Sequence, residues 1–183
     1  FDASTGGPYT VTVTATDFDD EGNPTGTSVA TSFDWDVTNP APVATDDIDS
    51  TDEDTAISRN AASGVIAPND TDGAPDGDVL VVDQVAGSDT QVGIPVAGSS
   101  GGVFTINADG SYDFDPDGDF EDLAVGESRT TQVSYRISDG EGGTDSAVLT
   151  VTVNGVNDAP VTTGIGDQSS TDGETILVDV SGS

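Results

Sequence analysis

The stretch that decides the fold is residues 132–161, which read QVSYRISDGEGGTDSAVLTVTVNGVNDAPV. Apolar and polar residues alternate on both sides of a Ser-Asp-Gly-Glu-Gly-Gly turn, and a period of two is typical of a half-buried β-strand. The pattern predicts an antiparallel hairpin of Gln132–Ser138 and Ala147–Asn154, followed by a short linker that contains proline. We interpret this unit as the closing hairpin of a β-sandwich.

The same arrangement occurs earlier in the chain. Residues 9–43 run strand, Asp-Phe-Asp-Asp-Glu-Gly turn, strand and then the linker Val-Thr-Asn-Pro-Ala-Pro-Val. Such an internal repeat indicates tandem units, and it divides the chain into residues 1–40, 41–158 and 159–183. Only the middle piece has the length of a complete sandwich, for which ~100 residues is typical. We therefore expect the chain to be a segment of a longer tandem array.

The rest of the chain also indicates β-structure. No segment shows a sustained apolar period of 3.6 residues, and turn clusters recur at short intervals, which favours an all-β fold. The other predicted strands are Tyr9–Thr16, Val79–Val85, Val103–Asn107, Ser111–Asp115 and Thr175–Val180. Trp35, the only tryptophan, shares a strand face with Phe33 and Val37, so it is interpreted as a core residue; a sugar-stacking platform is the alternative.

The composition excludes whole classes of chemistry. The chain has 35 acidic and 3 basic residues, a formal net charge of −32, and neither histidine nor cysteine; it also lacks lysine. Histidine acid–base catalysis, thiol chemistry, Schiff bases, disulfides and His/Cys zinc sites are therefore excluded. Nucleic acid and anionic membranes are disfavoured, because both are bound through Lys and Arg. Paired acids can serve a glycosidase, but no buried cleft is indicated, and we expect no enzyme.

The acidic residues concentrate where neighbouring units would meet. Alternating strand directions place the loop 68–78 and the turn 139–144 at one end of the middle sandwich, here called the upper end, beside Asn39. The loops around 49–54 and 116–130 fall at the opposite, lower end, beside Asn157 and Asp158. Two carboxylates ~4 Å apart repel by roughly 4 kcal/mol at an effective dielectric of 20. Ca²⁺, which takes 6–8 oxygen ligands, would relieve this repulsion; simple solvation of surface acids is the alternative.

These residues resemble a known family. The stretches that carry the resemblance are NPAPVA (39–44), TDEDT (51–55), NDTD (69–72), ADGSY (108–112), DLAVGES (122–128), SYRISDG (134–140) and VNDAP (156–160). Together they resemble the VCBS-type and related cadherin-like repeats of large bacterial surface proteins. The two terminal pieces resemble halves of a dystroglycan-type cadherin-like domain. The resemblance implies Ig/cadherin-like antiparallel β-sandwich modules in tandem, all-β throughout.

The resemblance also implies roles for individual residues. Asp70 and Asp72 resemble an acidic pair of a calcium-binding loop, Asp139 the acid of the closing turn, and Glu53 a glutamate of the first loop. Asn157 and Asp158 resemble linker ligands, and Asp17 resembles the closing-turn acid of the preceding unit. The predicted metal ligands are Asp17, Asp19, Asn39, Glu53, Asp70, Asp72, Asp78, Asp139, Asn157 and Asp158. The first linker departs from the pattern, because Pro40 follows Asn39 where Asp158 follows Asn157.

One further motif competes for metal. Asp113, Asp115, Asp117 and Gly118 match the opening of an EF-hand loop, but its twelfth position is Ala124 instead of a bidentate Glu. No flanking helices are indicated, so an EF-hand is disfavoured, while an irregular calcium loop on this DxDxDG run stays open.

The resemblance implies rod-like arrays in secreted RTX-type adhesins with Ca²⁺ at the joints, although no RTX nonapeptide occurs in this chain. We expect an extracellular, calcium-rigidified extender of a bacterial surface adhesin that spaces a binding tip from the cell in adhesion or biofilm formation. Its partners would be calcium and neighbouring repeats, without membrane insertion. Recognition of a carbohydrate or protein is the alternative, and so is head-to-tail assembly through the incomplete terminal units.

Overall fold

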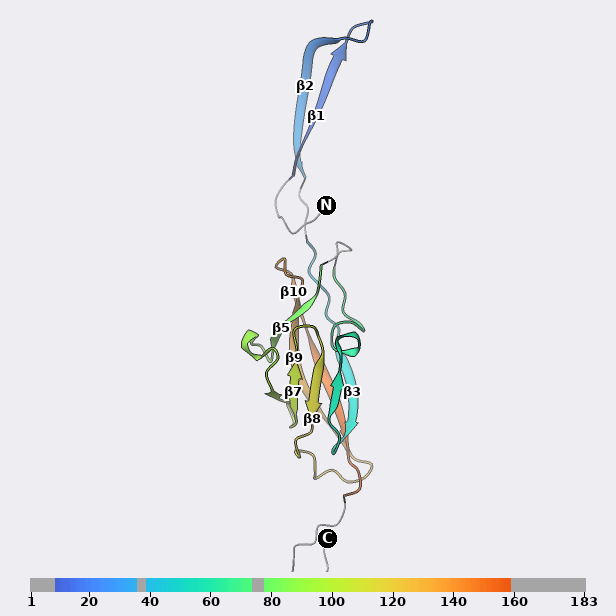
Figure 1. Ribbon diagram of the computed structural model, residues 1–183, viewed down its shortest axis with the longest axis vertical. Helices are drawn as coiled ribbons and strands as arrows, with labels where there is room; N and C mark the ends of the chain where they lie inside the picture. The colour runs from blue at the N-terminus through green and yellow to red at the C-terminus, as the bar shows by residue number, and fades with distance from the viewer. Residues whose placement is uncertain (1–8, 36–38, 74–77, 159–183) are drawn as a thin grey trace, which may run out of the picture.

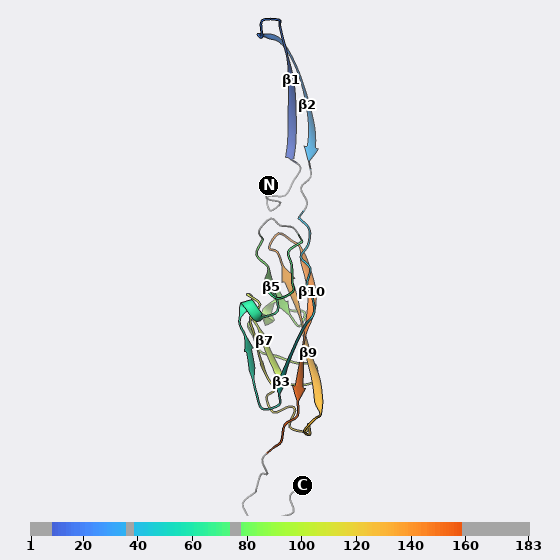
Figure 2. The ribbon, with the colours of Figure 1, turned by 90° about the vertical axis from the view of Figure 1, so that its right-hand side faces the viewer.

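The computed structural model describes residues 9–35, 39–73 and 78–158. Two four-stranded sheets pack face to face to form a sandwich, and a two-stranded hairpin precedes them in the chain (Figures 1 and 2). The hairpin consists of β1 (Tyr9–Phe18) and β2 (Pro24–Trp35). The all-β class expected from the sequence is confirmed.

The two sheets of the sandwich draw their strands from different parts of residues 47–154. The first sheet has the order β3 (Asp47–Asp52), β10 (Thr144–Asn154), β9 (Ser128–Ser138), β5 (Val81–Val85). The second has the order β4 (Ile57–Arg59), β8 (Tyr112–Asp115), β7 (Val103–Ile106), β6 (Val96–Ala97). Two short 3-10 helices, η2 (Ala61–Ser63) and η3 (Asp89–Gln91), lie in the connections.

The predicted closing hairpin is present as β9 and β10. The strands are antiparallel, with Val133 opposite Leu149 and Tyr135 opposite Ala147, and all four side chains are buried. Both strands begin before their predicted first residues, β9 at Ser128 and β10 at Thr144. The added residues are mostly polar, so pairing with the neighbouring strand extends each element beyond its apolar pattern.

The core lies between the two sheets. The rings of Phe104 on β7 and Phe114 on β8 are both fully buried, with centroids 4.6 Å apart. Gly102 has φ +70°, and a Cβ atom there would lie 2.5 Å from the Phe114 ring. Glycine at this position therefore supplies both the backbone conformation and the space that the ring needs. The predicted short hairpin of β7 and β8 is also confirmed.

One pair of strands is parallel. β3 runs beside β10 in the same direction, with Asp52 opposite Asn154, so the sandwich is not purely antiparallel. Both strands run from the upper end to the lower end, as the predicted alternation of chain direction requires. Asp49, which the sequence analysis assigned to the lower loop, lies within β3 instead. Its carboxylate accepts hydrogen bonds from Arg59 at 2.8 Å and from the Tyr112 hydroxyl at 2.6 Å, which join β3 to the opposite sheet.

The hairpin of β1 and β2 repeats the β9–β10 pattern without the same burial. Val11 is opposite Phe33 and Val13 opposite Thr31, yet the exposed fractions are 56% for Val13 and 51% for Phe33. Phe33, which shares the strand face on which the core interpretation of Trp35 rests, is therefore exposed in the part of the chain that the structure describes. The surroundings of the Trp35 side chain, and the predicted strand Thr175–Val180, lie outside the described residues.

Candidate metal centres

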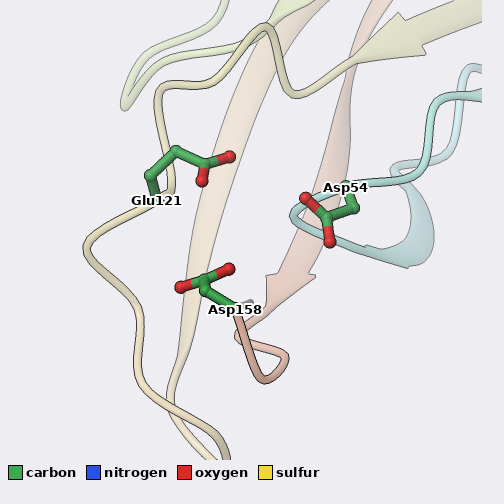
Figure 3. Close-up of side chains that lie close together, drawn as sticks. All are labelled: Asp54, Glu121 and Asp158. Atoms are coloured by element: carbon green, nitrogen blue, oxygen red, sulfur yellow. The ribbon is translucent and has the colours of Figure 1, made fainter. Parts of the chain in front are cut away.

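Three carboxylates converge at the lower end of the sandwich. Asp54, Glu121 and Asp158 are exposed, and each contributes an oxygen that lies within 4.8 Å of the other two (Figure 3). Asp54 follows β3, Asp158 follows β10, and Glu121 lies in the loop between β8 and β9. Since β3 and β10 are parallel neighbours, the residues that follow each strand emerge at the same end of the sheet. The fold therefore gathers acids from three separate segments.

Glu53 is a buried carboxylate beside this cluster. Its residue is 2% exposed, and one carboxylate oxygen, Oε1, accepts a hydrogen bond from the Val156 backbone N–H at 2.8 Å. The other oxygen, Oε2, is buried and has no hydrogen-bond partner. A buried acceptor without a partner is costly and rare in proteins, and a bound ion is one of its recognised explanations. Glu53 also fixes the start of the lower linker, because it binds Val156 directly.

The electrostatics of the lower end are repulsive. The pKa of Glu121 is raised from its ordinary value, first by desolvation and then by repulsion from Asp54, Asp158 and Glu53. Oxygens that bind one Ca²⁺ at 2.3–2.6 Å lie no more than about 5 Å apart, so the spacing of the three carboxylates fits this ion. The donor set is made of hard oxygens only, which Ca²⁺ accepts in flexible geometry.

Asp139 at the upper end is compensated by the protein itself. It is 5% exposed, and its Oδ1 accepts hydrogen bonds from the backbone N–H groups of Glu141 at 2.8 Å and Gly143 at 3.0 Å. Its Oδ2 accepts a hydrogen bond from the side-chain amide of Asn39 at 2.9 Å. The predicted neighbours Asn39 and Asp139 are thus in direct contact.

The other predicted upper residues lie in the loop between η2 and β5. Asp70 accepts a hydrogen bond from the Thr45 N–H at 2.7 Å, and desolvation together with repulsion from Asp47 raises its pKa to about 6. One carboxylate oxygen of Asp72, Oδ1, is buried without a partner, and so is the side-chain oxygen of Asn39. Asp78 precedes β5, whose first residue pairs with Ser138 beside the closing turn. The upper end therefore also presents oxygens that could accept a cation.

The tip of the β1–β2 hairpin corrects one assignment. The carboxylate of Asp19 accepts hydrogen bonds from the N–H groups of Glu21 at 3.0 Å and Asn23 at 2.8 Å. Asp139 accepts from the second and fourth following residues in the same way. The counterpart of Asp139 in the hairpin is therefore Asp19 and not Asp17, which lies within β1. The two Asp-X-Glu-Gly turns in the sequence, residues 19–22 and 139–142, also align Asp19 with Asp139.

The acids of the DxDxDG run make local hydrogen bonds and are not part of the group of three converging acids. The carboxylate of Asp113 accepts a hydrogen bond from Ser58, that of Asp115 accepts one from the Asp117 N–H at 2.9 Å, and that of Asp119 accepts one from the Gly102 N–H at 2.9 Å. Asp113 and Asp115 lie on β8, whereas an EF-hand needs these positions in a loop between two helices. Among the described residues, the group of three acids that lie close enough together to share a metal ion is at the lower end.

The sequence predicts Glu53, Asn157 and Asp158 as ligands at the lower end. The side-chain amide of Asn157 donates to the Asp158 backbone carbonyl at 3.2 Å. Asp54 and Glu121 were placed at the lower end but not among the ligands. Nothing in the local pattern distinguishes Glu121 from the other acids of its loop, because its position depends on the path of the loop in space.

The chain is similar to proteins of a known family. Residues 39–155 match the family model described as bacterial cadherin-like domain. A protein named calcium-binding lectin RapA2, from Rhizobium johnstonii, is 36% identical over 130 residues, which cover 66% of this chain and 50% of that protein. The chain therefore spans half the length of this curated relative.

Among solved structures, a protocadherin gammaB7 EC3-6 cis-dimer is similar over 85% of this chain and 34% of its own, with 18% identity and a TM-score of 0.37. None of the described residues form a helix that is long and apolar enough to cross a membrane. The match of the family model covers more than half of the chain, including every strand of the sandwich. The chain belongs to the bacterial cadherin-like domain family.

Proposed function

We propose that this chain is a calcium-binding, adhesion-related module in which Ca²⁺ fixes the joint below the sandwich. The observation that carries the proposal is the lower centre, where three carboxylates on separate segments converge beside the buried, unpartnered oxygen of Glu53. The name of the relative RapA2 supports calcium as the ion. Family membership supports a role in adhesion.

In the lower centre, Ca²⁺ would be held by Glu53, Asp54, Glu121 and Asp158, with Asn157 as a neighbouring oxygen donor. The ion would link the turn after β3, the loop between β8 and β9, and the linker after β10. Each segment would then be held to the other two through one cation. The linker would lose freedom relative to the sandwich, which is the physical basis of a calcium-stiffened joint.

A second centre is proposed at the upper end. Its candidate ligands are Asn39, Asp70, Asp72, Asp78 and Asp139. The unpartnered oxygens of Asn39 and Asp72 support this assignment. At the hairpin tip we propose Asp19, together with the predicted Asp17, because Asp19 occupies the position that Asp139 has in the sandwich. We also propose that residues 1–40, 41–158 and 159–183 are three separate units of a tandem array.

The biological role that we propose is an extender on the outside of a bacterial cell, spacing a distal binding tip in adhesion or biofilm formation. Extracellular calcium modules bind with Kd of about 10⁻⁴–10⁻³ M, a range in which the ion is bound outside a cell. A segment whose linkers stiffen with calcium would serve as a spacer without any ligand of its own.

Calorimetric titration with Ca²⁺ tests the lower centre. The double variant Asp54→Asn, Glu121→Gln removes two of the converging charges, and we expect at least one ion fewer to bind, or an affinity at this site lower by about tenfold or more, since ligand charge tunes the affinity of calcium sites. The matched control is Asp113→Asn, which removes an exposed acid outside the cluster. Equal binding by the double variant and the parent chain would refute the proposed centre.

Carbohydrate recognition is the second candidate, and the word lectin in the name of RapA2 favours it. Pull-down with bacterial polysaccharide distinguishes the two functions. Retention that is lost in Trp35→Ala would support recognition by this module, whereas no retention together with calcium stiffening would support the extender.

Head-to-tail self-association is a further proposal, supported by the exposed apolar face of the hairpin. Residues 159–183 repeat the sequence pattern of residues 41–60, and β3 in that stretch pairs with β10, the counterpart of β2. The tail of one molecule could therefore add to β2 of the next. Light scattering that gives a strict monomer at high concentration would exclude it.

A further inference from the structure

The linker at the upper end is attached by a direct contact between two side chains. The amide of Asn39 donates to Asp139 Oδ2 at 2.9 Å, while two backbone N–H groups donate to Asp139 Oδ1. Asp139 therefore receives three N–H donors although it is 5% exposed. Hydrogen bonds to an ionised acceptor are about twice as strong as neutral ones, and here they compensate the charge of Asp139 without a cation.

Two glycines allow the linker to lie close against the sandwich. A Cβ atom on Gly143 would lie 2.1 Å from Asp139 Oδ2 and 2.9 Å from Ala41 Cα. A Cβ atom on Gly73 would lie 2.3 Å from the Ala41 carbonyl oxygen. These distances leave no room for a larger residue, so the linker passes between the closing turn and the loop before β5.

Backbone hydrogen bonds continue the attachment. The Val43 N–H donates to the Thr71 carbonyl at 2.8 Å, and the Thr71 N–H donates to the Val43 carbonyl at 3.1 Å. The Ala44 N–H donates to the carboxylate of Asp145 at 2.9 Å. The upper linker is thus held by protein donors and acceptors along its described length.

The lower linker differs in its chemistry. Where the upper linker has Pro40 after Asn39, the lower linker has Asp158 after Asn157, so it brings a negative charge into the acidic cluster. Among the described residues, the hydrogen bond to a carboxylate of the cluster or of Glu53 is the one that the Val156 N–H donates to Glu53. The lower linker therefore adds repulsion where the upper linker adds a hydrogen-bond donor.

We infer that the two joints of this module differ in what they require: the Asn39–Asp139 contact closes the upper joint even when the proposed upper centre holds no metal, whereas the lower joint closes only when a divalent cation bridges its carboxylates. The part about the lower joint rests on the proposed function, and the part about the upper joint does not. In an array built this way, removal of calcium would release the lower linker and leave the upper linker attached.

Amide hydrogen exchange followed by NMR tests both joints in one sample of the full chain. In EDTA, with no metal bound at either end, we expect the Val43 and Thr71 amides to stay protected. The Val156 amide should exchange at least about tenfold more slowly in calcium than in EDTA. A tenfold difference requires only that calcium stabilise the closed linker relative to the open one by about 1.4 kcal/mol.

Variants of Asn39 separate the contact from general stability. Asn39→Ala removes the donor, so the Val43 and Thr71 amides should exchange at least about tenfold faster in EDTA, given the strength of hydrogen bonds to charged groups. Asn39→Asp places a second carboxylate against Asp139, and it should convert the upper joint into a calcium-dependent one, open in EDTA and protected again in calcium. Asn157→Asp is the matched control and should leave the upper amides unchanged.

The possible failures are distinguishable. Upper amides of the parent chain that exchange freely in EDTA and become protected only in calcium would overturn the inference. So would an Asn39→Asp variant with the same protection as the parent in EDTA. A Val156 amide that ignores calcium while the upper amides stay protected would instead contradict the proposed function at the lower centre.

Discussion

Calcium at 10 mM should raise the melting temperature of the chain by roughly 5–10 °C over its value in EDTA. At a Kd of about 10⁻⁴–10⁻³ M this concentration is about 10–100 times Kd, and binding to the native state then adds roughly 1.4–2.7 kcal/mol per site. A domain of about 110 residues gains on the order of 4 °C for each kcal/mol. The physical reason is that the ion binds only where the fold brings Asp54, Glu121 and Asp158 together.

Three comparisons make this prediction specific. Mg²⁺ at the same concentration should give a smaller shift, because Mg²⁺ retains its waters and fits all-protein oxygen cages less well. The double variant Asp54→Asn, Glu121→Gln should lose most of the lower-end contribution in calcium and should melt no lower than the parent in EDTA, since it removes repulsion. A melting temperature that is the same with calcium and with EDTA would contradict the proposed function.

Phe114→Ala should lower the free energy of unfolding of the sandwich by about 3–5 kcal/mol, the range for truncating a buried phenylalanine. The Phe114 ring is fully buried and packs on Phe104 at 4.6 Å between centroids, and the close approach of Gly102 leaves little room for the cavity to collapse. β8, which carries Phe114, leads directly into the loop that positions Glu121. Urea denaturation followed by circular dichroism measures the effect.

A residue of the same type provides the control. Phe18 at the end of β1 is 57% exposed, and Phe18→Ala should change the unfolding of the sandwich by less than about 0.5 kcal/mol, as is usual for surface positions. If Phe114→Ala does not fold, Phe114→Leu, which leaves a smaller cavity, should fold with an intermediate loss. Equal stabilities for Phe114→Ala and the parent would show that the two sheets do not share the core described above.

The two ends of the sandwich show how a single residue type can serve different physical purposes. At the upper end Asp139 accepts three N–H donors and is compensated where it is buried. At the lower end Asp158 approaches other carboxylates, and desolvation together with repulsion from Asp54 and Asp158 raises the pKa of Glu121. Acidic composition alone predicts the same behaviour at both ends, and the difference comes from the donors that each turn presents.

The sequence by itself determined the strands with a clear alternation and the ends at which their loops lie, whereas β3, β4 and β6 were not among the predicted strands. Period-two alternation is a local property, so β1, β7, β8, β9 and β10 could be recognised from residues such as Val133, Tyr135 and Ile137 without knowledge of their neighbours. The alternating direction of successive strands then placed Glu53 and Asp158 at one end and Asp139 at the other.

Only the tertiary structure decided which acids converge. Asp54 and Asp158 are distant in sequence and meet because β3 lies parallel to β10, and Glu121 joins them from the loop between β8 and β9. Asp115 and Asp119 lie in an equally acidic stretch, yet one carboxylate oxygen of each accepts a backbone N–H and neither residue belongs to the group of three converging acids. Coordination depends on the convergence of free oxygens in three dimensions, and neither loop paths nor turn donors are contained in a local pattern of residue types.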